Sequence, residues 1–506
     1  MASKMLLAVV LLSVITCLSS APKAGVIQGI ALENLTGLPL ARARLSLARL
    51  EGNRLKPVAT IAASRNGQFV FAALEEGHYQ VSGVRAGFAE ARFGQRRNNG
   101  PGSPIFVPRD GSHFVELRLK RLGAITGRML DENRVGMPGV PVVAYTTSVP
   151  MRIVGSATSD DRGFYRITGL LPSRYFIRTG PAQLEDALNL LPTYYPFTSV
   201  VLRDAQPVSV DLDTDTTHMD IQPVPGNLSS LGIHVTGCLG IAQVTLSTDT
   251  GRRHANAPCN LGPIRFNGLA PGEYEVLAEG EADRQNLAGF HSVHLDMERE
   301  IGLALRPLHD FALRLTDAAG LALRDIGIIA RRRDLAGEGP DQVLTGERVQ
   351  LPPGFWQITA RPPASHYLSD LKVDAGGYRR ARKDPNPEWF EFYLDYSIRA
   401  SISLSSQTAQ LLGRVTLAGK AAIAAPVYLL PTTPQTRRRM NGLRTTHTDA
   451  NGNYRFDGLA PGAYVVLSSL DIAEVNEETM GAAQARALTL EEGRTGTQDL
   501  ELYQLP

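Results

Sequence analysis

The chain has 506 residues, with 52 Lys and Arg against 50 Asp and Glu, and a net charge of +2. This length predicts several domains, and a composition of 43% hydrophobic and 20% charged residues excludes a wholly disordered chain. The balanced charge gives no indication of a nucleic-acid or anionic-membrane partner, while 48 Gly and 32 Pro are typical of a turn-rich β protein.

The first 21 residues have the features of a secretory signal peptide. Lys4 precedes an apolar run at 5–18, and small residues at 19–21 offer a cleavage position. A run of about 14 apolar residues is short for a membrane anchor. A lipoprotein signal would use Cys17, but the residue before it fits that signal poorly. We expect cleavage after Ala21, a secreted, periplasmic or cell-surface location, and no later membrane span.

The next stretch shows a pattern that later recurs. A Gly-led strand is expected at 25–32, and Asn66-Gly67 marks a hairpin turn before an alternating strand that ends at Leu74. Glu76-Gly77 then forms a turn, and Tyr79 opens the following strand. The same order appears with the strand at 123–130, the turn Arg162-Gly163 and a corner that runs from Leu170 to Tyr175.

An aromatic cluster follows this second copy. Tyr194, Tyr195 and Phe197 lie close together in the sequence. Exposed aromatic rings can stack on sugars, so Tyr194 and Tyr195 are candidate ligand-binding residues. Packing between domains is the alternative.

The third stretch contains Cys238 and Cys259, the cysteines that remain after signal cleavage. In an oxidising compartment they can pair, and a loop of about 20 residues would stabilise its domain by about 3 kcal/mol. Two buried free thiols are the alternative. Two cysteines alone make no zinc site.

No catalytic motif is visible. His291 and His294 lie near Asp296 and Glu298 on an expected strand, but alternation places His291 on the opposite face from the others. The sequence also lacks a nucleophile elbow, a P-loop, a dinucleotide fingerprint and room for an α/β catalytic domain. We therefore expect no enzyme activity, no cofactor, no metal and no catalytic residue.

The fourth stretch has a corner from Leu351 to Trp356 and an Arg triplet at 331–333, which we expect on a solvated edge together with a second triplet at 437–439. Trp389 and Tyr393 alternate with apolar residues, so they are expected on the exposed face of a strand and are candidate ligand-binding residues. Inter-domain packing is again the alternative.

The last stretch repeats the pattern most clearly. A strand at 411–419 is followed by the turn Asn451-Gly452 and a complete corner from Leu459 to Tyr464. Asp449 begins a segment faintly similar to a calcium loop, but the distant Glu is missing, so a tight turn is expected. Helical patterns are nearly absent, with one or two turns possible by composition at 480–488 and 183–191.

The corner is the repeated element of this chain. Its aromatic residues are Tyr79, Tyr175, Tyr274, Trp356 and Tyr464. Their spacings of 96, 99, 82 and 108 residues exceed a solenoid repeat and fit one sandwich domain each. Leu anchors the strand end, Pro and Gly form a type II turn, and the tyrosine hydroxyl can bond a backbone group a few residues earlier, as in a tyrosine corner. The Trp356 indole N–H can donate instead.

The motifs resemble the carboxypeptidase regulatory-like, or prealbumin-like, domain in tandem copies from secreted bacterial proteins of the acidobacterial type. The clearest copies are 413–467, 123–177 and 25–81. The resemblance implies an all-β chain of five seven-stranded Greek-key sandwiches, prealbumin-like or Ig-like, arranged as beads on a string. In that family such modules accompany peptidases, outer-membrane receptors or surface proteins, and carry no catalytic residues.

We place domain boundaries in the turn-rich stretches before each opening strand. The signal peptide at 1–21 is followed by sandwiches at 22–121, 122–225, 226–307, 308–406 and 407–506. The expected function is non-catalytic, in adhesion, scaffolding or protein binding at the cell envelope, with an unknown protein or glycan as partner. The alternatives are a carbohydrate-binding protein that uses exposed aromatics, or an accessory to a hydrolase.

Overall fold

The described part of the protein consists of β-strands with two short α-helices and two 3-10 turns, at Leu202–Asp204 and Leu323–Asp325. The computed structural model describes residues 24–148, 151–183, 189–196, 202–249, 251–317, 320–374, 386, 388–440 and 442–505. The signal peptide, Phe197 and most of the segment 183–191 lie outside the described residues.

The strands form five groups, which we call modules 1 to 5. Module 1 contains β1 (Gly25–Glu33), β2 (Arg44–Glu51), β3 (Arg54–Ala62), β4 (Gln68–Leu74), β5 (Gly77–Val84), β6 (Ala91–Arg92), β7 (Ile105–Val107) and β8 (Ser112–Leu119). Module 2 contains β9 (Gly123–Arg128), β10 (Pro141–Thr146), β11 (Ile153–Thr158), β12 (Phe164–Leu170), β13 (Ser173–Thr179), β14 (Ala182–Gln183), β15 (Asn189–Leu191), β16 (Val208–Val210), β17 (Asp215–Thr216) and β18 (Val224–Pro225). Module 3 contains β19 (Ser229–Thr236), β20 (Leu239–Thr248), β21 (Gly251–Pro258), β22 (Ile264–Leu269), β23 (Gly272–Ala282), β24 (Gln285–Leu295), β25 (Arg299–Ala304) and β26 (Arg306–Pro307).

Modules 4 and 5 complete the chain. Module 4 contains β27 (His309–Asp317), β28 (Gly327–Asp334), β29 (Gly337–Glu338), β30 (Gln342–Val343), β31 (Arg348–Leu351), β32 (Gly354–Arg361), β33 (Tyr367–Val373), β34 (Phe390–Leu394) and β35 (Ile398–Ser405). Module 5 contains β36 (Ala409–Leu417), β37 (Lys420–Ala421), β38 (Pro426–Pro431), α1 (Pro434–Met440), β39 (Arg444–His447), β40 (Asn453–Leu459), β41 (Gly462–Ser468), α2 (Glu477–Ala482), β42 (Arg486–Leu490), β43 (Thr495–Thr497) and β44 (Leu500–Glu501).

All five modules pair their first strand in the same way. The first strand of each pairs antiparallel with the strand that precedes the corner, and parallel with a strand at the end of the module, as β1 does with β4 and β8. The same relation joins β19 to β22 and β25, and β27 to β31 and β35. The second sheet is built around the strand that follows the corner, for example β5 or β23. Strand number departs from the implied seven: module 1 has eight strands, β1–β8, and the described residues of module 4 form nine, β27–β35.

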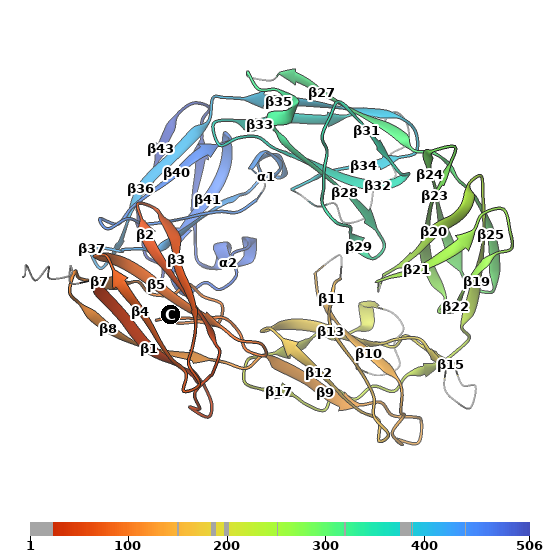
Figure 1. The fold of residues 1–506 in the computed structure, drawn as a ribbon, viewed down its shortest axis with the longest axis horizontal. Coiled ribbons are helices and arrows are strands. Elements are labelled where there is room, and N and C mark those ends of the chain that lie inside the picture. The colour runs from red at the N-terminus through yellow and green to blue at the C-terminus, as the bar shows by residue number, and fades with distance from the viewer. Residues whose placement is uncertain are drawn as a thin grey trace, which may run out of the picture.

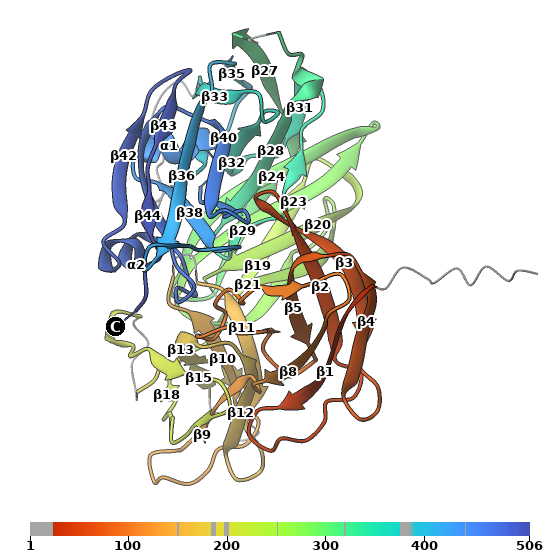
Figure 2. The ribbon, with the colours of Figure 1, turned by 90° about the vertical axis from the view of Figure 1, so that its left-hand side faces the viewer.

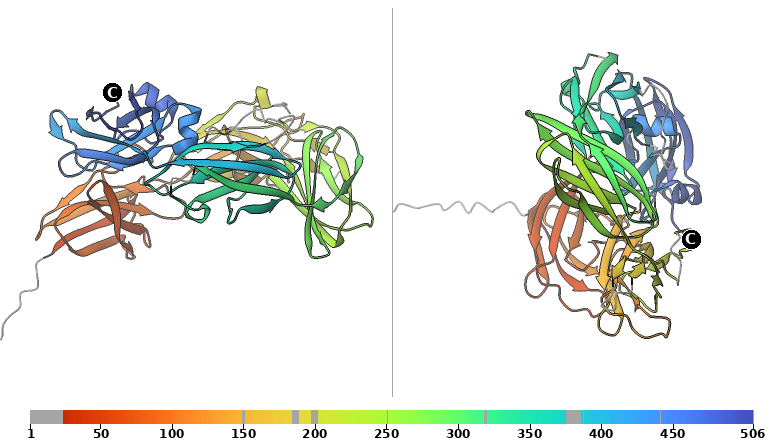
Figure 3. Two further views of the ribbon diagram at one scale, coloured as in Figure 1. Left: turned by 90° about the horizontal axis from the view of Figure 1, so that it is seen from above. Right: turned by 90° about the vertical axis from the view of Figure 1, so that its right-hand side faces the viewer.

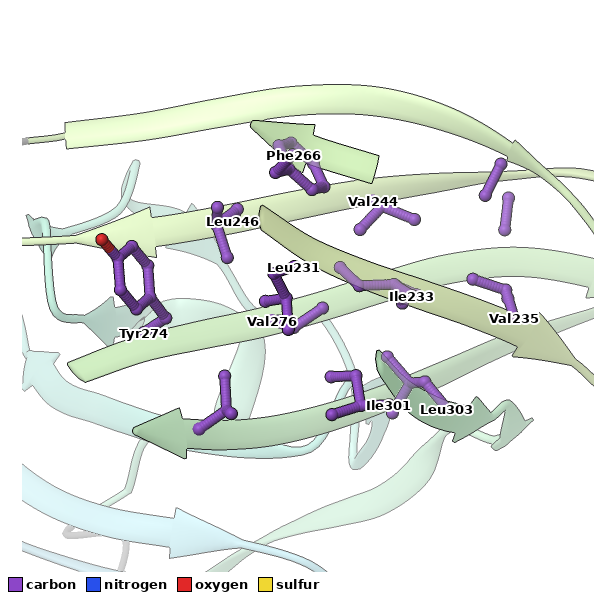
Figure 4. Packing of buried hydrophobic residues seen from close by; sticks show 14 of the residues in the cluster. Leu231, Ile233, Val235, Val244, Leu246, Phe266, Tyr274, Val276, Ile301 and Leu303 are labelled. Atoms are coloured by element: carbon purple, nitrogen blue, oxygen red, sulfur yellow. The ribbon is translucent and has the colours of Figure 1, made fainter. Parts of the chain in front are cut away.

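Each module is a sandwich whose core fills the space between its two sheets. In module 3, Leu231 and Ile233 of β19 meet Leu246 of β20 and Val276 of β23, all 0% exposed (Figure 4). Alternation along each strand puts these side chains on one face, and this burial of apolar area is the main stabilising contribution. The all-β, tandem-sandwich architecture predicted from the sequence is confirmed.

The modules form a closed ring rather than an open string (Figure 1). Module 5 returns to module 1, where Asn53 in the β2–β3 turn exchanges hydrogen bonds with His447 of β39. Module 5 is displaced from module 1 along the ring axis, so the ring is not flat and its two ends lie at different heights (Figures 2 and 3). The expectation of beads on a string is therefore wrong in its geometry, because the short linkers let neighbouring modules pack.

The two sheets of each sandwich have different surroundings. The corner-containing sheets, with β5, β13, β23, β32 and β41, face the centre of the ring, and the sheets with β1, β9, β19, β27 and β36 face outward (Figure 1). We call these the inner and outer sheets. Side chains on inner-sheet hairpins can therefore meet across module boundaries.

Candidate functional site

The five predicted corner residues make the same contact. Each donates from its hydroxyl or indole N–H to the carbonyl four residues earlier: Tyr79 to Glu75 (2.8 Å), Tyr175 to Leu171 (2.7 Å), Tyr274 to Ala270 (2.6 Å), Trp356 to Pro352 (3.0 Å) and Tyr464 to Ala460 (2.6 Å). Burial raises the pKa of Tyr274 to about 12, which keeps its hydroxyl protonated and able to donate. The corners thus pin the start of one inner strand to the turn before it in each sandwich.

Cys238 and Cys259 form a disulfide in the core of module 3, with their Cα atoms 5.7 Å apart. This bond ties the start of β20 to the turn after β21.

The structure places the candidate ligand-binding aromatics differently from the expectation. Trp389 is 7% exposed and lies just before β34, with the Arg331 guanidinium 4.1 Å from the centre of its ring. Tyr393 is half-buried and packs edge-on against Phe355 (4.8 Å) and Phe290 of module 3 (6.3 Å). The expected exposed Trp-Tyr pair is wrong, because module 3 and the arginines of β28 cover this face.

The two described residues of the second aromatic cluster, Tyr194 and Tyr195, are covered to different degrees. Tyr194 is 2% exposed, and Arg178 lies over its ring at 5.1 Å. Tyr195 is half-buried and packs on the core of module 2. Tyr194 therefore offers no exposed ring for stacking on a sugar, and the ligand-binding role of Tyr195 stays a prediction.

Neither arginine triplet lies on a solvated edge: the first packs mainly within module 4 and the second lies at the contact of modules 4 and 5. Arg333 of β28 is 4% exposed and pairs with Glu391 at 2.7 Å. In the second triplet, on α1, Arg438 covers Phe390 at 5.1 Å and Arg439 donates to the carbonyl of Ser369 in module 4 at 3.1 Å. The expected solvated edges are wrong.

Hairpins from modules 2, 3 and 4 converge inside the ring, and we call their polar side chains the inner cluster (Figure 1). At its base Asp334, at the tip of the β28–β29 hairpin, is 5% exposed and accepts two bonds from Arg252 of module 3, at 2.7 and 2.8 Å. Ser247 donates to the same carboxylate at 2.8 Å, and the Leu335 amide donates to Glu275 at 3.1 Å. These bonds dock the module 4 hairpin onto module 3.

A second contact spans the ring. Arg152, just before β11 in module 2, pairs with Glu338 of β29 at 2.9 Å, and Glu338 also accepts from Arg331 at 3.4 Å. A pocket of about 330 Å³ lies here, lined by these three side chains and the backbone at 336–339. Arg152 is 68% exposed in its side chain, so this end of the inner cluster faces solvent.

Arg332 is the remaining cation of this region. Its guanidinium lies 5.3 Å from the centre of the Phe290 ring at the contact of modules 3 and 4. Burial lowers the pKa of Arg332, although the nearby Asp334 and Glu275 carboxylates oppose this effect. The charged groups of the inner cluster therefore hold modules together and present a mixed polar surface.

Among the described residues, no group of three or more His, Cys, Asp or Glu side chains could hold a metal ion. His294 pairs with Glu273 at 2.8 Å on an exposed strand face. Asp449 accepts from the amides of Asn451 and Asn453 at 2.8 Å, the geometry of a tight turn. No helix in the described ranges has the length and apolar character needed to cross a membrane.

Sequence reasoning did not find the inner cluster. The signal was present in Arg331–Asp334, where four charged residues continue an alternating strand. Their role depends on partners such as Arg152 and Arg252, which are far away in sequence.

Comparisons with known proteins complete this description. No protein-family model matches the chain, and no curated protein matches its sequence. The chain is similar to the minor pilin of Streptococcus agalactiae, with 13% identity over 40% of this chain and 98% of that chain and a TM-score of 0.24. It is similar to the shaft pilin of Lactobacillus rhamnosus GG, with 12% identity over 40% of this chain and 98% of that chain and a TM-score of 0.25. It is also similar to the TIE protein of Bacillus anthracis, with 11% identity over 72% of this chain and 69% of that chain and a TM-score of 0.17.

These scores are too low to carry a fold or a function over to this chain. The resemblance to the carboxypeptidase regulatory-like domain has no matching family model, so it stays a prediction. What stands is the coarser description: tandem β-sandwich modules, here joined in a ring.

Proposed function

We propose that this protein is a non-catalytic scaffold, secreted to the cell envelope, which binds a protein partner through its inner face. The closed ring is the observation that carries the proposal. It turns five inner sheets toward one space, and contacts between charged side chains fix modules 2, 3 and 4 relative to one another. A surface that is fixed before binding loses little conformational entropy on association.

The inner sheets also expose side chains suited to protein contact. Ile153 is 53% exposed on β11, next to Arg152, and Val343 is 67% exposed on β30. Exposed apolar residues beside an arginine are typical of binding surfaces. We also propose that each module is one domain, with the boundaries predicted from the sequence.

The test uses the full mature chain immobilised and exposed to cell-envelope proteins, with cross-linking and identification of the bound partner. The double variant Arg152→Glu, Ile153→Asp should lose at least about tenfold in affinity for that partner. Phe114→Asp, on the outer sheet of module 1 and 66% exposed in the native protein, is the matched control and should bind normally. Equal binding by both variants, or turnover of peptide or ester substrates, would overturn the proposal.

A further inference from the structure

A second concave surface lies where modules 2 and 3 meet. This groove has a volume of about 530 Å³ and is formed by separate chain segments, including β15, the linker before β19, the end of β22 and the β24–β25 turn. Grooves at domain contacts are common places for ligands. None of the side chains of the inner cluster belongs to it.

Carboxamides and hydroxyls dominate the chemistry of this groove. Asn189, Asn227 and Asn267 line it, and their side chains make no hydrogen bond to any other residue of the described part of the chain. Each carboxamide offers both donor and acceptor atoms. The three carboxamides therefore offer about six hydrogen-bonding groups, one C=O and one NH2 each, for which the described part of the chain provides no partner.

Little net charge remains in the groove. Glu298 is already satisfied, because it accepts from Ser230 at 3.0 Å and from Arg265 at 2.7 Å. Asp296 is exposed and pairs with no described cation. One open carboxylate excludes an anionic ligand, and it is too few for tight binding of a polycation.

The apolar part of the groove is small, and its most exposed side chain is a flexible methionine. Met297 is 66% exposed at the β24–β25 turn, and Leu228 is half-buried beside it. A thioether adapts to irregular surfaces and can therefore pack against the C–H face of a sugar ring. Open carboxamides, one carboxylate and a small apolar floor match the alternating hydroxyls of a saccharide.

We propose that this groove binds a neutral oligosaccharide. The carboxamides of Asn227 and Asn267 and the carboxylate of Asp296 contact sugar hydroxyls, and Met297 lies under the ring. The groove needs modules 2 and 3 in fixed positions, which the Arg178–Asp249 pair (3.2 Å) supports. This site uses no stacked aromatic residue and so differs from the platform expected from the sequence.

The inference goes beyond the proposed protein-binding function and does not depend on the inner face. Full-length protein is applied to an array of neutral and charged glycans, and hits are measured by calorimetry. Asn267→Ala and Asp296→Ala should each weaken binding at least about tenfold, since each removes hydrogen bonds to the ligand. Asn286→Ala, at an exposed position on β24 of the same module, is the control and should bind as the native protein does.

Salt separates a neutral from a charged ligand. The affinity should change less than about twofold between 0.05 and 0.5 M salt, because no ionic contact is involved. The proposal is overturned if no neutral glycan binds, if only charged glycans bind, or if the groove variants, shown to be folded by circular dichroism, bind as tightly as the control. Failure here leaves the Arg152 and Ile153 experiment unaffected.

Discussion

The contact between modules 3 and 4 and the closing contact between modules 5 and 1 are built in different ways. At the first, the buried Asp334 carboxylate accepts from Arg252, Ser247 and the Ala336 amide. At the second, which we call the seam, the contacts centre on Asn53, whose side-chain amide donates to the carbonyls of His447 (2.7 Å) and Asn453 (2.8 Å).

Because one contact is a buried charged network and the other a set of neutral hydrogen bonds, we expect the contact between modules 3 and 4 to be stronger than the seam. Removing one partner from a buried charged network leaves the other charge uncompensated, whereas neutral hydrogen bonds near solvent contribute little net free energy. The seam adds one weak ion pair, Arg96 with Asp471, at 3.8 Å. As denaturant is added, the ring should therefore open at the seam at a lower concentration than the one that separates modules 3 and 4.

The largest effect is expected at the strong contact. Asp334→Ala should lower the free energy of unfolding by about 3–5 kcal/mol, because Arg252 loses its buried counterion. Chemical denaturation of the full chain measures this. Asp341→Ala is the control, since its carboxylate is half exposed and 3.9 Å from Arg331, and it should cost at most about 0.5 kcal/mol. Similar losses in both variants would contradict the comparison.

The disulfide shows whether the strong contact depends on the rigidity of module 3. Replacing Cys238 and Cys259 with Ser should cost about 3 kcal/mol, because the 21-residue separation gives the reduced unfolded chain more freedom. Hydrogen exchange at the Leu335 amide should stay as slow as in the native protein. Faster exchange there would mean that the contact relies on the disulfide.

A smaller change should open the seam. Asn53→Ala removes two side-chain hydrogen bonds and should shift the closing equilibrium by about 1–2 kcal/mol. Small-angle scattering should show a larger radius of gyration, and exchange should rise at 444–447, with the stability of each module unchanged. An unaltered radius of gyration would show that other contacts hold the seam.

The smallest effect is a dependence on pH. Burial lowers the pKa of His447, so the closed ring favours the neutral imidazole. An opened seam would expose His447 and return its pKa toward about 6.5. Seam stability is therefore complete above that value and falls as the pH drops below it, because the open form binds more protons. The protection factors of the amides at 444–447, which correct for the slower intrinsic exchange at low pH, should fall from pH 7 to pH 5, and His447→Gln should remove this fall.

Local sequence predicted the sandwiches because their signals are short-range. The turn glycines and the corner residues act within one or two strands, so Tyr464 and its four counterparts could be located from spacing alone. The Asp449 turn is equally local, and it recurs at Asp160, which accepts from the amides of Arg162 and Phe164.

The ring and its inner cluster could not be predicted in this way. Alternation around Trp389 describes a strand face but not the arginine of a neighbouring strand that covers it. Asn53 and His447 are separated by 394 positions, and nothing local in either segment indicates the other. Burial of Tyr194 under Arg178 has the same origin, since both depend on how the chain folds back on itself.

The parallel pairing of first and last strands has a mechanical consequence. Because β1 and β8 run in the same direction, tension applied at the two ends of a module slides one strand along the other and loads all their hydrogen bonds at once. Force on the whole chain would break the seam first, release slack, and then load the parallel strand pairs of the modules in series, which are long in module 1 and short in module 2. Single-molecule stretching should show one small early event before the module ruptures, and its absence would contradict this sequence of events.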